Sequence, residues 1–274
     1  MDCRELRDME KQKGETLRDT RFGQRLVCLP SVGSTNDTAK ELAAQGAAEG
    51  TVVVADEQTA GRGRMGRRWV APPGTCLLCS LLFRPQLAPL HANRLTMLCS
   101  LAAADAVAEV AGLQVALKWP NDLIVASASQ PARWGKLAGV LTETGIVAGE
   151  LDFVVVGIGV NVNVPPEALP ALAPNAASIL AETGRKVSRA ALLAVLLAGV
   201  QARYERLRAG ESPRAEWAAR LATLGQRVDV VTSGGRLTGV AESVDEDGAL
   251  LLRTADGKLH RLLAGDVTLS INRA

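Results

Sequence analysis

The chain has 274 residues, 47% of them hydrophobic, which is enough for one large domain or for one large and one small domain with buried cores. Its 31 lysines and arginines are balanced by 29 acidic residues, so no overall basic field exists to attract nucleic acid. The longest fully apolar run, residues 190–200, is about half as long as a membrane-spanning helix requires. With five cysteines, an odd number, and a highly charged N-terminus in place of a secretory signal, we expect a soluble, cytoplasmic protein that does not enter a membrane.

The first 22 residues carry many charges and few large apolar side chains, which is typical of a frayed helix or a mobile tail and leaves no room for a DNA-reading helix-turn-helix. A strand is predicted over residues 25–29 and a helix over residues 38–45. Three polar residues open this helix: Ser34, Thr35 and Asn36. Taken alone they are best interpreted as helix caps, and the second interpretation is that their side chains bind the polar head of a ligand.

A strand predicted over residues 51–55 leads into a basic loop that runs from Gln58 to Trp69. Three glycines alternate in this loop with four arginines, and no acidic residue falls inside it. Glycine lets the backbone approach a ligand closely, and arginine presents a planar set of donors that matches carboxylate and phosphate oxygens. The loop is therefore suited to close over an anion, although the loop alone also allows a solvated flexible segment or a nucleic-acid arm.

The elements expected next are a strand, a helix and two further strands, over residues 76–83, 93–112, 115–119 and 123–125. Cys76 and Cys79 form a lone C-x-x-C that a strand places on opposite faces, and with only two histidines in the chain we expect no zinc site. Lys118 lies in an otherwise apolar strand just before the interruption Trp119-Pro120-Asn121-Asp122. A lysine in such a strand needs an anionic partner.

Residues 126–131 form a small polar loop without evident chemistry. After it, Lys136 stands at the head of a predicted strand that ends in Glu143, and a further strand is predicted over residues 153–164. Gly157 and Gly159 alternate in this last strand. They either leave a groove that a ligand or another backbone can enter, or allow tight packing against a helix.

Two helices are predicted over residues 188–209 and 213–224, and the second carries Trp217. Beyond Gly225 the pattern changes to short apolar runs separated by hairpin signals such as Ser233-Gly234-Gly235 and Asp256-Gly257. The expected strands cover residues 227–231, 237–243, 249–254, 259–263 and 267–271. This pattern predicts a small β-barrel of about 50 residues at the C-terminal end.

Five motifs now stand in one order: Ser34-Thr35-Asn36, Gln58 with Gly61 to Trp69, Lys118 to Asp122, Lys136 to Glu143, and Gly157 to Asn161. In that order, across residues 26–165, they resemble the bacterial biotin protein ligases, and the terminal barrel resembles the SH3-like C-terminal domain of that family. The resemblance implies an α/β (α+β) fold, with a mixed-sheet catalytic domain like that of class II synthetases. It divides the chain into a charged segment (1–22), a biotin- and ATP-binding domain (23–224) and the barrel (225–274).

The resemblance implies that biotin and ATP react to biotinyl-5′-AMP and that the biotinyl group then passes to a lysine of a biotin carboxyl carrier protein domain, with Mg²⁺ accompanying ATP. Neither step needs a protein nucleophile, in keeping with a chain rich in arginine and poor in histidine. The N-terminal segment is too short for the winged helix of the regulatory members, so we expect a monofunctional ligase, monomeric or homodimeric, without operator DNA as a partner. The alternatives are a lipoate or octanoate ligase or transferase of the same fold, which the basic loop and the barrel disfavour, and a nucleic-acid-binding module.

The same resemblance assigns roles to single residues. The biotin site would comprise Ser34, Thr35, Asn36, Gln58, Arg62, Gly63, Arg64, Lys136 and Gly139. The nucleotide site would comprise Arg67, Trp69, Lys118, Asn121, Asn161 and Trp217, although both tryptophans are also compatible with an ordinary core position. Lys136, Arg64 and Asp122 would be catalytic, and Asp122 either binds Mg²⁺ or accepts a proton from the incoming lysine. We also expect the basic loop to order over its ligand as a lid.

Overall fold

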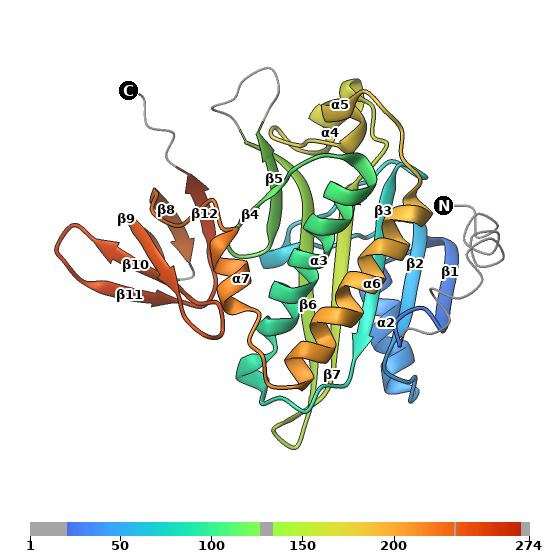
Figure 1. Cartoon of the computed structure of the whole chain (residues 1–274), viewed down its shortest axis with the longest axis horizontal. Coiled ribbons are helices and arrows are strands. Elements are labelled where there is room, and N and C mark those ends of the chain that lie inside the picture. The colour runs from blue at the N-terminus through green and yellow to red at the C-terminus, as the bar shows by residue number, and fades with distance from the viewer. Residues whose placement is uncertain (1–20, 127–133, 233, 270–274) are drawn as a thin grey trace.

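The computed structural model describes residues 21–126, 134–232 and 234–269. These residues form a mixed seven-stranded sheet with helices on both faces and a separate five-stranded antiparallel sheet at the C-terminal end (Figure 1). The charged N-terminal segment, except Arg21 and Phe22, and the polar loop at 126–131, except Ala126, lie outside the described residues. No helix within the described ranges has the length and apolar character needed to cross a membrane.

The seven-stranded sheet has the order β1-β2-β3-β7-β6-β5-β4, in which β1 and β2 are parallel and all other neighbours are antiparallel. The strands are β1 Arg25–Val32, β2 Thr51–Gln58, β3 Cys76–Phe83, β4 Ala116–Lys118, β5 Asp122–Ala126, β6 Trp134–Val147 and β7 Glu150–Asn161. Every predicted strand of this region is confirmed in position. β6 and β7 are joined in a long hairpin, so β6 continues beyond Glu143, and β7 ends at Asn161, before the predicted Val164.

The helices are α2 Thr35–Ala44, α3 Asn93–Ala111, α4 Leu169–Leu172, α5 Ile179–Thr183, α6 Arg189–Arg208 and α7 Arg214–Ala219, with short 3₁₀ turns η1 Arg64–Gly66, η2 Pro89–His91 and η3 Pro166–Ala168. Ser188 caps α6 as its position suggests, because its hydroxyl accepts a hydrogen bond from Ala191 N at 3.1 Å. α7 is shorter than predicted, because it ends at Ala219. The residues after it pair with β4, where Ala222 N donates to Leu117 O at 2.8 Å.

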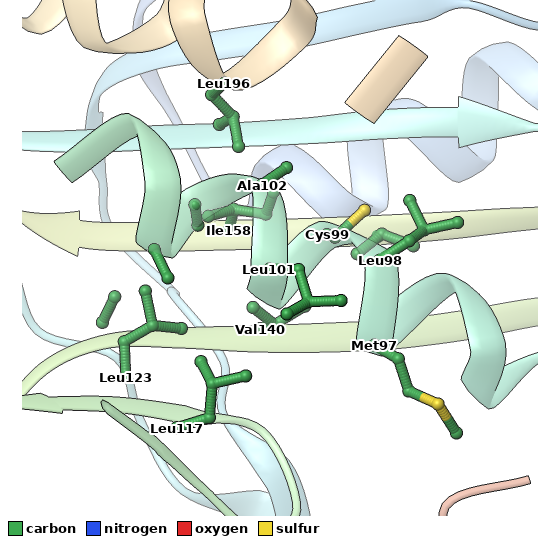
Figure 2. Packing of buried hydrophobic residues seen from close by; sticks show 14 of the residues in the cluster. Met97, Leu98, Cys99, Leu101, Ala102, Leu117, Leu123, Val140, Ile158 and Leu196 are labelled. Carbon is green, nitrogen blue, oxygen red and sulfur yellow. The ribbon is translucent and has the colours of Figure 1, made fainter. Parts of the chain in front are cut away.

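The main core lies between the sheet and the helices α3 and α6. Figure 2 shows Leu101 and Ala102 of α3 facing Val140 of β6 and Ile158 of β7, with Leu196 of α6 above them. β3 is buried along its whole length, and its two cysteines belong to different clusters, so their predicted opposite orientation is confirmed. Because alternate residues of β7 point to this core, Gly157 and Gly159 face the other side of the sheet.

The C-terminal sheet consists of β8 Arg227–Thr232, β9 Gly235–Val244, β10 Leu250–Thr254, β11 Leu259–Leu262 and β12 Asp266–Leu269, in the order β11-β10-β9-β8-β12. The predicted succession of short strands is confirmed, and it forms the SH3-like C-terminal domain. The turn between β9 and β10 docks on the larger domain, since Trp119 Nε1 donates to Gly248 O at 2.8 Å and Asn93 Nδ2 donates to Asp247 O at 2.8 Å. This contact sets the C-terminal domain beside β4 and α7 (Figure 1).

Candidate active site

A pocket of about 310 Å³ lies on the side of the sheet that carries Gly157 and Gly159. Its walls come from the start of α2, the basic loop, the turn between β4 and β5, the strands β6 and β7, and β12 of the C-terminal domain. It brings together all predicted site residues except Asn161 and Trp217: Ser34, Thr35, Asn36, Gln58, Arg62, Gly63, Arg64, Arg67, Trp69, Lys118, Asn121, Asp122, Lys136 and Gly139. Residues far apart in the sequence therefore share one cavity.

The two exceptions lie in different surroundings. Asn161 lines an adjoining hollow of about 230 Å³ that also has Trp69 and Lys118 in its wall, and its own amide donates to Ala177 O at 2.9 Å. Trp217 is 1% exposed in the main core, where α7 meets the C-terminal domain. Its place among the nucleotide-binding residues is therefore not supported, and the ordinary core position is the one observed.

One end of the pocket is a cluster of neutral polar side chains. Thr35 donates to Gln58 Oε1 from its backbone N at 2.7 Å and from its hydroxyl at 2.9 Å. Ser80 Oγ lies 2.6 Å from Asn36 Oδ1 and 2.8 Å from Thr35 Oγ1. These residues are almost fully buried, apart from Gln58, which is intermediate. Gln58 thus binds the first N–H of α2 as well as the Thr35 hydroxyl, and Thr35, Asn36 and Ser80 bind one another through their side chains.

The expectation that Ser34, Thr35 and Asn36 only cap α2 is wrong. Ser34 stands at the N-cap position with extended backbone, but its side chain makes no capping hydrogen bond. The backbone carbonyl of Ser34 instead accepts the first helical bond, from Thr38 N at 3.1 Å. The Ser34 hydroxyl is therefore available to a ligand in the pocket that it lines.

The glycines of β6 and β7 provide room for two larger side chains. A Cβ on Gly157 would lie 2.2 Å from Asn36 Oδ1, and a Cβ on Gly159 would lie 2.7 Å from the ring of Trp69. Gly157 therefore allows tight packing against the start of α2, whereas Gly159 packs against Trp69 of the basic loop rather than against a helix. Both glycines also line the pocket. The Trp69 ring in turn has Lys136 Nζ at 5.7 Å from its centroid, within reach of a cation–π contact.

The basic loop folds back on itself. Gly63 N donates to Arg67 O at 2.7 Å, Trp69 N donates to Gly61 O at 2.9 Å, and Met65 adopts a left-handed conformation with φ 55°. These contacts turn the arginine side chains in different directions: Arg62 binds Asp37 and Glu143, Arg64 approaches Asn121 Oδ1 at 3.5 Å, and Arg67 binds Asp266 of the C-terminal domain.

The pocket is also lined by cationic side chains, among them Arg64, Lys118 and Lys136. Lys136 Nζ lies 2.6 Å from Asp122 Oδ1. Burial lowers the pKa of Arg64, and burial together with the nearby Lys136 and Arg67 lowers the pKa of Lys118 despite the opposing effect of Asp122. Several positive charges are thus gathered in partly desolvated surroundings, which is the environment that an anionic ligand stabilises.

Residues 28–161 match the Biotin/lipoate A/B protein ligase family, and residues 223–270 match the Biotin protein ligase C terminal domain. The bifunctional ligase/repressor BirA of Bacillus subtilis is 35% identical over 251 residues, which cover 90% of this chain and 75% of that protein. The biotin–[acetyl-CoA-carboxylase] ligase of Mycobacterium tuberculosis is 35% identical over 264 residues, covering 92% of this chain and 93% of that protein. The chain belongs to the biotin protein ligase family.

A solved structure supports the assignment at the level of the fold. The biotin protein ligase from Aquifex aeolicus in complex with biotin and ATP aligns with a TM-score of 0.72 at 28% identity, over 90% of this chain and 98% of that one. The alignment spans both domains of the present chain. The chain therefore has the mixed-sheet catalytic domain and the SH3-like C-terminal domain expected from its sequence.

Three residues of this biotin protein ligase belong to the site or its border but carry no predicted role: Ser80, Glu143 and Asp266. Ser80 is the single polar residue in the apolar run 76–83, a signal that sequence reasoning could have used. Glu143 is part of a motif that marked the family, yet nothing in the sequence indicated its partners. Asp266 comes from the other domain, and its proximity depends on how the two domains pack.

A Mg²⁺ ion would find few protein ligands here. Among the described residues no group of three histidines, cysteines or carboxylates could hold a metal, and the acids that line the pocket, Asp122 and Asp266, are each paired with a cation. Mg²⁺ commonly binds through one or two carboxylates and the oxygens of substrate phosphates. The residues therefore fit an ion held mainly by phosphates, with Asp122 as the nearest candidate to assist.

Proposed function

We propose that this biotin protein ligase uses the pocket to join the carboxylate of biotin to the α-phosphate of ATP, and that it then transfers the biotinyl group to a lysine of a carrier-protein domain. The observation that carries the proposal is the joining of a neutral polar cluster to a cationic cluster in one cavity. The first suits an uncharged polar ring, and the second suits a carboxylate and a phosphate.

The neutral cluster favours a ligand that donates hydrogen bonds. Its side-chain oxygens make three contacts with one another, but Thr35 and Ser80 supply only two hydroxyl hydrogens between them. The Asn36 amide supplies no third, because its Nδ2 points to Leu141 O and Glu143 Oε2. The ureido ring of biotin carries N–H groups, whereas the dithiolane of lipoate and the chain of octanoate carry none. Biotin therefore fits this cluster better than the acids handled by the related ligases and transferases.

In the first step a carboxylate oxygen of biotin attacks the α-phosphorus of ATP, the new C–O–P linkage forms, and the P–O bond to pyrophosphate breaks. Negative charge increases at the phosphoryl oxygens and on pyrophosphate, and Lys136, Arg64 and Lys118 are the cations of the pocket that would stabilise it. Because Arg64 and Lys118 are partly desolvated, their attraction for the anions is stronger than that of exposed charges.

In the second step the neutral amine of an acceptor lysine attacks the acyl carbon, and AMP leaves with the bonding electron pair. The amine must first lose a proton, and Asp122 is the carboxylate beside Lys136 that could accept it. The same position would let Asp122 assist a Mg²⁺ ion on the phosphates, whose role would be to neutralise their charge. The basic loop would cover the adenylate between the two steps and keep water away from the anhydride.

The test is incubation of the full-length protein with biotin, MgATP and a purified biotin carboxyl carrier domain, followed by mass measurement of the carrier. We expect a mass increase equal to one biotinyl group that requires both biotin and ATP. Lipoate and octanoate, offered in place of biotin, should give no product. Transfer of either acid at the rate of biotin would overturn the assignment, and so would a carrier whose mass does not change.

A further inference from the structure

Glu143 lies between the neutral cluster and the basic loop, and it makes hydrogen bonds to both. Its Oε2 atom accepts a hydrogen bond from Asn36 Nδ2 at 2.7 Å and another from Arg62 NH2 at 2.8 Å. Its Oε1 atom accepts from Lys40 Nζ at 2.9 Å. One carboxylate oxygen is thus shared between a residue of the neutral cluster and a residue of the loop, although 107 positions separate Glu143 from Asn36 and 81 separate it from Arg62.

The side-chain amide of Asn36 has a single orientation. Both acceptors near Nδ2, Leu141 O and Glu143 Oε2, require the amide nitrogen to face them, so Oδ1 faces Ser80 and the pocket. Asn36 is 4% exposed, and Gly157 leaves no room behind it, since a Cβ there would lie 2.2 Å from Oδ1. A ligand that bonds to Oδ1 therefore acts on an amide whose other end is bonded to Glu143.

The Arg62 side chain, on the basic loop, is held less tightly than the Asn36 amide. The Arg62 side chain is 39% exposed, and it is held by Asp37 Oδ1 at 2.6 Å as well as by Glu143. Lys40 also contacts both acids. Among the described contacts the Asp37 carboxylate binds Arg62 and Lys40 but not the Asn36 side chain, so it tethers the loop without bonding to the Asn36 amide. Asp37 and Glu143 thus provide a matched pair of acids, of which only Glu143 connects the two regions.

We propose that Glu143 is a positioning residue that couples binding at Asn36 to closure of the basic loop through Arg62. The inference rests on the proposed function, because it takes the ligand at Asn36 to be the ureido ring of biotin. A ligand that fixes the Asn36 amide also fixes Glu143 Oε2 and strengthens its bond with Arg62. By thermodynamic reciprocity, a loop held by Glu143 binds biotin more tightly by the same factor.

The experiment measures biotin affinity by calorimetry and loop closure by the rate at which trypsin cuts within residues 58–69, with and without saturating biotin. It compares the parent with Glu143→Gln and with the control Asp37→Asn. In the parent we expect biotin to slow cleavage. In Glu143→Gln, biotin affinity should fall about tenfold, the effect of losing a charged hydrogen bond, and saturating biotin should no longer slow cleavage. In Asp37→Asn, cleavage should be faster throughout, but biotin should slow it by the same factor as in the parent.

Each outcome has one meaning. Undiminished protection by biotin in Glu143→Gln overturns the coupling, and so does a loss of protection in Asp37→Asn that equals the loss in Glu143→Gln. A parent that binds no biotin overturns the proposed function instead. If thermal melting shows Glu143→Gln to be unfolded, Glu143→Asp takes its place: it keeps the charge, but its shorter side chain cannot serve Asn36 and Arg62 together, so the same loss of protection is expected.

Discussion

Lys136 Nζ and Asp122 Oδ1 lie 2.6 Å apart, so the lysine expected to stabilise the reacting phosphate is paired with the acid expected to bind metal or remove a proton. The two residues come from neighbouring strands, β6 and β5. Their pairing gives Asp122 a third role, which the sequence did not suggest: it holds the Lys136 side chain in place over the pocket.

The third role leads to a prediction for Asp122→Asn. If Asp122 positions Lys136 or assists Mg²⁺, adenylate formation should fall about 100-fold, while transfer from supplied biotinyl-AMP should change much less. Biotin-dependent exchange of pyrophosphate into ATP measures the first step, and carrier mass measures the second. In a cycle with Lys136→Met, the double variant should be scarcely slower than the single ones, because the two side chains act as one unit. The reverse pattern, with normal exchange and slow transfer, would identify Asp122 as the base.

A second prediction concerns Arg64→Gly. Arg64 reaches from the loop towards Asn121 on the far wall of the pocket, at 3.5 Å, so its loss removes a contact that spans the cavity. We expect the fold to remain intact and biotinyl-AMP to escape into solution several times faster than in the parent. The measurement is free adenylate by chromatography, with melting temperature as the check on folding. The control is Met65→Gly, because Met65 is 58% exposed and its φ of 55° suits glycine. Equal release from parent and Arg64→Gly would argue against a lid.

The motifs come together around one pocket because each contributes a short run of residues to one face of a sheet, and the strands of that sheet could be located from their apolar patterns. Partners of those residues were harder to foresee. The pairing of Lys136 with Asp122 depends on the register of β5 and β6, and the contact of Arg67 with Asp266 depends on the packing of two domains. Trp217 lies outside every motif, and its burial in the main core accounts for this tryptophan without a ligand.

Helix starts show a further limit of sequence reasoning. A serine followed by threonine and asparagine has the composition of an N-cap, and Ser188 behaves accordingly at the start of α6. At the start of α2, by contrast, the side chains of Thr35 and Asn36 form hydrogen bonds with Gln58 and Ser80. The partners lie on other strands, 23 and 44 positions away, so a local pattern contains no information about them.

A third prediction concerns Gly159→Ala. The added Cβ would lie 2.7 Å from the Trp69 ring and within 2.9 Å of its Nε1, so the ring must move and the pocket wall with it. We expect a loss of about 1–3 kcal/mol in stability, typical of overpacking, together with weaker ATP binding. Thermal melting and calorimetry with ATP measure the two effects. Gly33→Ala is the control, because a Cβ on Gly33 has no neighbour within 4 Å. Comparable losses in both variants would show that crowding against Trp69 is not the cause.

The last prediction concerns Lys118, whose charge is unfavourable for the fold. Burial, assisted by Lys136 and Arg67 and opposed by Asp122, lowers its pKa below the ordinary value of 10.5. The folded state therefore binds the proton more weakly than the unfolded state. The penalty is fully present at neutral pH, where Lys118 is charged in both states, and it decreases as the pH rises through the lowered pKa towards 10.5.

Lys118→Met should therefore stabilise the protein at neutral pH by about 1 kcal/mol, because it removes a charge that burial penalises in the folded state. It should also weaken the binding of ATP, because it removes a cation that would attract the phosphates. The stability difference between variant and parent should shrink as the pH rises from neutral to about 10, since the parent loses its penalty there and the variant has none. Chemical unfolding at several pH values measures this difference, and calorimetry measures ATP affinity. Lys258→Met, at a side chain 75% exposed on the C-terminal domain, is the matched control and should change neither quantity. A destabilised Lys118→Met, or a difference that grows with pH, would show that Lys118 contributes to the fold and that the positive charge in the pocket is already compensated.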